Sequence, residues 1–86
     1  MNTLETVRDN IDTIDDALLK LLQERVVLVK KIGEEKKRTN QPIRDYKREQ
    51  EQLLRLEEEA ERLHIPKVLI TNIWKLFFEI SEEIEK

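Results

Sequence analysis

The fold is decided by residues 4–38, which read LETVRDNIDTIDDALLKLLQERVVLVKKIGEEKKR. Apolar side chains recur there at alternating spacings of three and four residues, the pattern of a helix that packs against another helix. The repeat runs through Leu4, Val7, Ile11, Ile14, Leu18 and Leu21. A helix of this length spans about 50 Å, which suits the spine of a bundle or coiled coil. The lone Gly33 either marks a close helix crossing or is tolerated at a cost of up to about 1 kcal/mol.

Two cations interrupt the apolar face of this helix. Arg25 occupies the next position of the repeat, and Lys36 follows eleven residues later. At about 100° and about 1.5 Å per residue, the two side chains lie within roughly 20° of each other and about 16 Å apart. Val29 and Ile32 lie between them on the same face. Because burying a cation costs several kcal/mol unless an anion meets it, we expect a carboxylate of the protein or an anionic ligand there.

Two shorter helices are expected after the long one. Pro42 cannot continue a helix, and Asp45 is placed to cap a second helix over about 46–62. Pro66 suits the first position of a third helix over about 66–85. With one glycine and two prolines, the chain lacks the turn residues of a β-rich fold. Residues 1–86 are therefore predicted to form a single all-α domain of three helices, one long and two shorter.

Composition limits the classes of protein that fit. Of the 86 residues, 38% are hydrophobic and 41% are charged, so a core without an oligomeric partner is doubtful. The formal net charge of −3 argues weakly against nucleic-acid binding. No apolar run reaches the roughly 20 residues of a membrane span, and no signal-peptide pattern is present. We therefore expect a cytoplasmic protein that binds neither membrane nor nucleic acid.

The candidate chemistry lies in charged and polar side chains. The chain has no cysteine, no glycine-rich phosphate cradle and no cluster with metal-ligand spacing. The lone His64 lies at a helix boundary and is interpreted as a solvated turn residue. Covalent, metal-dependent and histidine acid–base catalysis are therefore poorly supported.

Two groups of polar side chains have helical spacing. Asp45, Arg48 and Glu49 share a face of the second helix, and Ser81 and Glu85 border the apolar stripe of the third. Any one of these is more often a solvated surface residue than a ligand. Arg25 is the exception, because its position in the repeat points inward.

Arg8 bears on quaternary structure. It precedes Arg25 by 17 residues, which places it about 25 Å away along the axis and roughly 100° around it. No small ligand could touch both side chains from one helix. An antiparallel copy of the helix would bring the second chain's Arg8 to the first chain's Arg25, giving an intertwined dimer with two sites.

Four stretches together resemble the all-helical, AroQ-class chorismate mutases. They are residues 7–15 (VRDNIDTID), residues 18–25 with their Leu18-Leu19 and Glu24-Arg25 pairs, residues 30–36 (KKIGEEK) and residues 42–49 (PIRDYKRE). The resemblance covers almost the whole chain, and residues 42–49 in combination with the upstream Arg8, Arg25 and Lys36 are a specific signal. It implies an intertwined homodimer of three-helix protomers that converts chorismate to prephenate in phenylalanine and tyrosine biosynthesis. It also implies that neither a cofactor nor a metal takes part. The initial Met1 favours a free-standing enzyme.

The resemblance assigns four cations to the substrate, which is a dicarboxylate. Arg25 and the partner's Arg8 are expected to grip the two carboxylates. Lys36 is expected to hydrogen-bond the ether oxygen while also touching a carboxylate. Arg48 is expected to add a further positive charge nearby.

The resemblance assigns the remaining contacts to polar and apolar side chains. Glu49 is expected to accept a hydrogen bond from the ring hydroxyl, with help from the backbone near Asp45. Ser81 is expected to contact the ring carboxylate, and Val29 and Phe78 are expected to pack against the ring.

Glu85 departs from the pattern of many bacterial members of the family, which have a glutamine at this position. That glutamine donates a hydrogen bond to the ether oxygen, which an ionised Glu85 would repel. We therefore expect Glu85 to act only when protonated, with Arg25 and Lys36 as the other catalytic residues. Glu85 is also next to last in the chain, where helices fray, so a solvated Glu85 is the alternative.

Two other functions remain open on the sequence. An isochorismate-pyruvate lyase of the same fold would use a similar anion grip. A non-catalytic, dimeric helical interaction module would explain the apolar repeat, but it would not require Arg8, Arg25, Lys36 and Arg48 to converge.

Overall fold

The computed structural model describes residues 2–86 as three α-helices: α1 (Thr3–Arg38), α2 (Tyr46–Arg62) and α3 (Lys67–Glu85). No strand occurs among these residues, so the predicted all-α class is confirmed. At the start of α1, the Asn2 side chain accepts a hydrogen bond from the Leu4 amide at 2.9 Å. The last turn of α1 is basic, which stabilises the carbonyl end of the helix dipole.

The breaks between helices follow local backbone chemistry. Asp45 caps α2 as predicted, because its carboxylate accepts a hydrogen bond from the Arg48 amide at 3.1 Å. Asn40 and His64 adopt a positive φ of 58° just beyond α1 and α2, a conformation that ends a helix. His64 is exposed in its turn. The prediction that Pro66 is the first helical residue is wrong: its ψ of 122° is extended, so α3 begins at Lys67.

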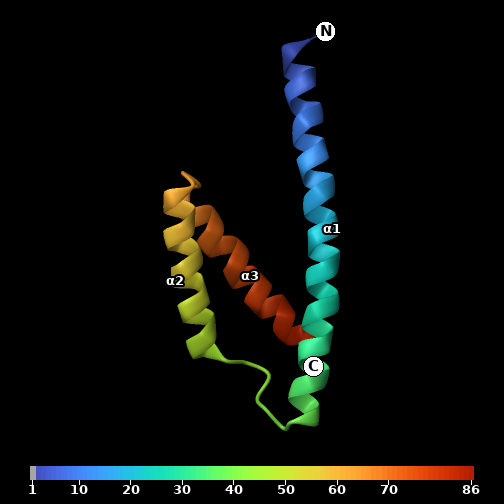
Figure 1. Ribbon diagram of the computed structural model, residues 1–86, viewed down its shortest axis with the longest axis vertical. Helices are drawn as coiled ribbons and strands as arrows, with labels where there is room; N and C mark the ends of the chain where they lie inside the picture. Colours follow the sequence, from blue (N-terminus) through green and yellow to red (C-terminus); the bar gives the residue numbers. More distant parts are fainter. Residues whose placement is uncertain (1) are drawn as a thin grey trace.

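The helix α3 packs against both other helices (Figure 1). It packs along α2 and crosses the C-terminal half of α1, whereas α1 and α2 do not pack against each other within residues 2–86. The N-terminal half of α1 extends alone beyond both. The chain measures 58 × 25 × 15 Å, and its radius of gyration of 16.4 Å exceeds the roughly 12 Å of a compact domain this long.

Gly33 marks the crossing of α1 and α3. A Cβ atom at this position would lie 2.7 Å from the Cα of Glu85 and 2.8 Å from its carbonyl oxygen. Only glycine allows the two backbones to approach this closely, so the close-crossing alternative is confirmed. The crossing places the end of α3 beside Lys36, three residues after the glycine.

A single chain buries little apolar surface. Val29 and Ala60 are the only buried hydrophobic residues in the described part of the chain. The six apolar residues of the α1 repeat are each 48 to 60% exposed. Such a contiguous apolar face is unusual on a monomer and is typical of an interaction surface. None of the helices in residues 2–86 is both long and apolar enough to cross a membrane.

Candidate active site

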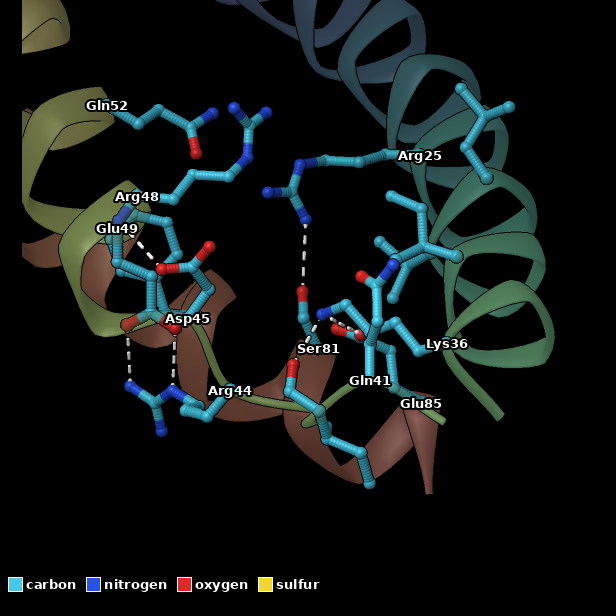
Figure 2. Close-up of a pocket in the computed structure, with 15 residues that line it drawn as sticks. Arg25, Lys36, Gln41, Arg44, Asp45, Arg48, Glu49, Gln52, Ser81 and Glu85 are labelled. Atoms are coloured by element: carbon cyan, nitrogen blue, oxygen red, sulfur yellow. Dashed lines mark hydrogen bonds and ion pairs between the residues drawn. The ribbon is translucent and has the colours of Figure 1, made fainter. Parts of the chain in front are cut away.

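A cavity of about 370 Å³ lies where the C-terminal half of α1, the first turns of α2 and the end of α3 meet (Figure 2). Its volume is typical of a site for a small molecule. All three helices and the segment between α1 and α2 contribute side chains. The lining residues are Arg25, Leu28, Val29, Ile32, Lys36, Gln41, Ile43, Arg44, Asp45, Arg48, Glu49, Gln52, Phe78, Ser81 and Glu85.

The structure brings together nine of the ten side chains singled out in the sequence. These nine are Arg25, Val29, Lys36, Asp45, Arg48, Glu49, Phe78, Ser81 and Glu85. The tenth, Arg8, is exposed on the N-terminal half of α1 and does not line the cavity. Its separation from Arg25 on one straight helix is about 25 Å, so one chain does not bring these two cations together.

Arg25 is a partly buried cation without a carboxylate partner. Its Nη1 donates a hydrogen bond to Ser81 Oγ at 3.4 Å, and its guanidinium carbon lies 4.3 Å from the centroid of the Phe77 ring. No carboxylate of the described residues forms an ion pair with it. Burial lowers the pKa of Arg25 below its usual value. The cavity therefore holds a desolvated positive charge that an anion would stabilise.

Lys36 is paired with a carboxylate of the protein, which is one of the two partners expected from the sequence. Its Nζ lies 2.6 Å from Glu85 Oε1 and also donates a hydrogen bond to the carbonyl oxygen of Ile43. Glu85 is only 8% exposed, because the crossing at Gly33 presses the end of α3 onto α1. The alternative of a frayed, solvated Glu85 is therefore wrong.

The α2 side of the cavity carries a second cation without a carboxylate partner. The Arg48 guanidinium extends from α2 toward the middle of the cavity, facing that of Arg25 (Figure 2). No carboxylate in residues 2–86 forms an ion pair with Arg48. The Asp45 carboxylate turns back onto the first turn of α2 as the helix cap. Glu49 is held by Arg44 through two hydrogen bonds, of 2.7 and 2.8 Å.

Six lining residues were not among the predicted site residues. They are Leu28, Ile32, Gln41, Ile43, Arg44 and Gln52. Two of them had a usable signal: Ile32 shares the face of Arg25 and Lys36, and Gln52 follows Arg48 by one helical turn. Gln41 and Ile43 lie in an irregular segment, where no periodicity indicates which side chains point inward.

The arrangement is suited to binding a small anion with more than one charged group. Arg25, Lys36 and Arg48 approach the cavity from two helices, and Ser81 and Glu49 add neutral and acidic hydrogen-bonding groups. Within residues 2–86, no three histidine, aspartate or glutamate side chains converge in an arrangement that could hold a metal ion.

Comparisons with a family model and with curated proteins point to the same family. Residues 7–86 match the family described as chorismate mutase type II. The chain is 38% identical over 85 residues to a bifunctional chorismate mutase/prephenate dehydratase of Buchnera aphidicola subsp. Acyrthosiphon pisum, covering 99% of this chain and 22% of that protein. It is 36% identical over 89 residues to a protein of the same name from Aquifex aeolicus, covering 100% of this chain and 25% of that protein.

A T-protein of Enterobacter agglomerans is 43% identical over 70 residues, covering 81% of this chain and 19% of that protein. The chain thus spans a quarter or less of the length of these curated relatives.

Proposed function

Because the chain belongs to the chorismate mutase type II family, we propose that it converts chorismate to prephenate in phenylalanine and tyrosine biosynthesis. The observation that carries this proposal is Arg25, a partly buried cation without a carboxylate partner in a cavity that also holds Lys36 and Arg48. Chorismate is a compact dianion, so its carboxylates would supply the charge that these cations lack.

The reaction explains why cations in a cavity are sufficient for catalysis. A [3,3] rearrangement is intramolecular and needs no nucleophile or general base. The protein has to hold the substrate in its compact reactive conformer, which Arg25 and Arg48 would do by binding its anionic groups. Lys36 would then donate a hydrogen bond to the ether oxygen, where negative charge builds as the C–O bond breaks.

A second copy of the chain would complete the site. The exposed apolar repeat of α1 offers a surface for it, and the charges of α1 favour an antiparallel arrangement. Residues 3–20 contain five carboxylates and two cations, whereas residues 21–38 contain three carboxylates and six cations. In an antiparallel pair the acidic half of each helix faces the basic half of the other. We propose an intertwined homodimer in which the partner's Arg8 reaches the cavity that contains Arg25.

A direct assay tests the proposed function. The protein is incubated with chorismate in buffer containing EDTA, and prephenate formation is followed. We expect turnover well above the uncatalysed rate without added metal or cofactor. Isochorismate is supplied in a parallel reaction, and formation of salicylate and pyruvate from it, with chorismate unchanged, would favour the lyase alternative. No conversion of either substrate would contradict an enzymatic role.

Exchanging its carboxylate for an amide tests the role of Glu85. The Glu85 carboxylate accepts a hydrogen bond from Lys36 in the free protein, whereas a group that acts on the ether oxygen must donate one. We therefore expect Glu85→Gln to raise kcat/KM, because an amide donates a hydrogen bond without first binding a proton.

The control is Glu83→Gln, which changes an exposed carboxylate two residues earlier. It should leave kcat/KM within about twofold of wild type, as expected of a surface substitution. An unchanged kcat/KM for Glu85→Gln would exclude the proposed role of Glu85.

A further inference from the structure

We propose that Arg44 is a positioning residue that fixes the carboxylate of Glu49 at the wall of the cavity and ties it to α3 through Glu82. This inference rests on the proposed function, because it assigns Arg44 a part in the same reaction. Arg44 itself makes no contact with the substrate in this scheme. Its effect on the reaction passes through Glu49.

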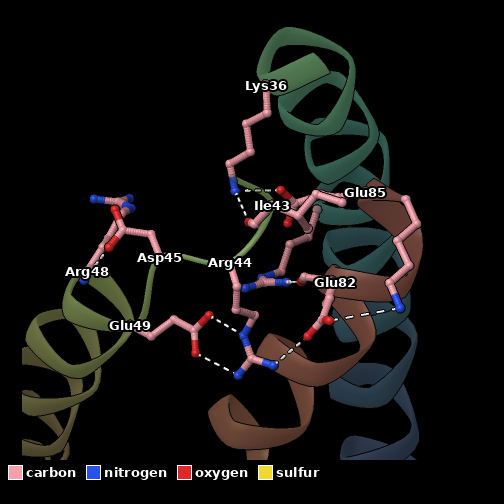
Figure 3. A network of polar contacts seen from close by, with 11 residues as sticks. Lys36, Ile43, Arg44, Asp45, Arg48, Glu49, Glu82 and Glu85 are labelled. Atoms are coloured by element: carbon pink, nitrogen blue, oxygen red, sulfur yellow. Dashed lines mark hydrogen bonds and ion pairs between the residues drawn. The ribbon is translucent and has the colours of Figure 1, made fainter. Parts of the chain in front are cut away.

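The geometry of the contact is that of a clamp (Figure 3). Arg44 Nε lies 2.7 Å from Glu49 Oε2, and Arg44 Nη2 lies 2.8 Å from Glu49 Oε1, so both carboxylate oxygens are held. The remaining nitrogen, Nη1, donates to Glu82 Oε2 at 2.7 Å. The guanidinium carbon also lies 4.7 Å from the centroid of the Tyr46 ring. Four contacts in different directions leave the guanidinium little freedom to move.

The clamp leaves Glu49 able to accept a further hydrogen bond. An ionised carboxylate has about four lone-pair sites, of which the bidentate contact uses two. A glutamate side chain has several rotatable bonds, and its ordering would otherwise have to accompany substrate binding. Because Arg44 already orders the Glu49 side chain in the free protein, its carboxylate can bind the ring hydroxyl of the substrate without a further loss of conformational entropy.

The charges distinguish Arg44 from the other arginines of the cavity. Hydrogen bonds to Glu49 and then to Glu82 raise the pKa of Arg44 above its usual range, and the one from Arg44 lowers the pKa of Glu82. Arg44 is thus neutralised by two carboxylates within the protein, whereas Arg25 has none. This makes Arg44 a poor anion ligand and a good support for Glu49.

The segment that carries Arg44 also holds the side chain of Lys36. Ile43, the preceding residue, accepts a hydrogen bond from Lys36 Nζ through its carbonyl oxygen. Two successive residues of the segment between α1 and α2 therefore bind the side chains of Lys36 and Glu49, on opposite sides of the segment (Figure 3). Fixing this segment fixes both side chains relative to each other.

The test is Arg44→Lys in the full chain. Lysine keeps the positive charge but cannot form the two parallel hydrogen bonds to Glu49. We expect kcat/KM for chorismate to fall roughly 10- to 100-fold, mainly in kcat, as is typical when a supporting partner is lost. The matched control is Arg62→Lys. Arg62 is an exposed arginine that forms an ion pair with Glu59 within α2, so this change should leave activity unchanged.

A double-mutant cycle separates positioning from a general structural effect. On the Glu49→Gln background, Arg44→Lys should change kcat by less than about twofold, because the side chain through which it acts is already altered. Glu82→Ala removes the contact to α3 but leaves the clamp on Glu49, so it should lower Tm with a smaller effect on kcat. An equal loss of kcat for Arg44→Lys on both backgrounds, or a loss that follows Tm across these variants, would overturn the proposal.

The two proposals can fail separately. If the wild-type protein does not convert chorismate, the proposed function fails. Positioning is then decided by a crystal structure of Arg44→Lys. A displaced or disordered Glu49 carboxylate supports it, and an unchanged carboxylate overturns it.

Discussion

Replacing Arg25 with alanine is expected to lower kcat/KM for chorismate by about 100- to 10,000-fold, or roughly 3 to 5 kcal/mol of transition-state stabilisation. The reason is that Arg25 is the partly buried cation that lacks a carboxylate partner and points into the cavity. A substrate carboxylate bound by this guanidinium would lose its charge-assisted hydrogen bonds. No other cation of α1 lies within one helical turn of Arg25 on that face.

The same substitution is expected to leave the protein folded. Burial lowers the pKa of Arg25, which means that the folded state disfavours its charged form. Removing the guanidinium relieves this penalty and forfeits the contact with the Phe77 ring, and we expect the two effects to offset each other approximately. Tm should therefore change little while activity falls.

The measurement is steady-state kinetics together with thermal unfolding followed by circular dichroism. Arg38→Ala serves as the control, because Arg38 is an exposed arginine on the same helix that pairs with Glu35. It should leave kcat/KM within about twofold of wild type, as expected of a surface substitution. Unchanged turnover for Arg25→Ala, with increased stability, would contradict the anion site and favour a non-catalytic helical module.

The helices were predictable because their signals are local. The apolar repeat defines α1, the Asp45 carboxylate caps α2 through the amide three residues later, and the two prolines lie in the breaks. Each of these signals acts over a few residues, so one sequence is enough to read them. The start of α3 was misplaced by one residue, since a proline is accommodated both at the first helical position and just before it.

The cavity residues were only partly predictable from local signals. Helical spacing alone placed Arg25, Val29 and Lys36 on one face of α1. It also singled out polar side chains of the two shorter helices, namely Asp45, Arg48, Glu49, Ser81 and Glu85. Their convergence on one substrate, and the inclusion of Phe78, came with the resemblance to a known family. Glu85 shows where local reasoning fails. A helix end is expected to fray, but the crossing at Gly33 buries it, and that contact spans 52 residues of sequence.

Two contacts between distant residues had no signal in the sequence. Arg44 and Glu82 are 38 residues apart, and nothing in the spacing of either indicates the other. The stacking of Arg25 on Phe77 joins α1 to α3 in the same way. Only the packing of α3 against both other helices brings these side chains together.

Mixing two inactive variants is expected to restore about a quarter of the wild-type activity. Arg8→Ala and Arg25→Ala should each lose most of their activity alone, because the proposed site combines Arg25 of one chain with the partner's Arg8. When equal amounts are unfolded together and refolded, about half of the dimers contain one chain of each kind. Each of these mixed dimers has one site with both arginines and one with neither.

The matched control is a mixture of Arg25→Ala with Lys36→Ala. Both residues belong to the same chain's part of the cavity, so every site in every dimer keeps one defect and no activity should return. Recovery in the first mixture but not in the second requires that Arg8 act across the dimer. If Arg8→Ala alone retains wild-type activity, or neither mixture recovers, then Arg8 does not complete a neighbouring site. In that case the exposed repeat of α1 would need another explanation.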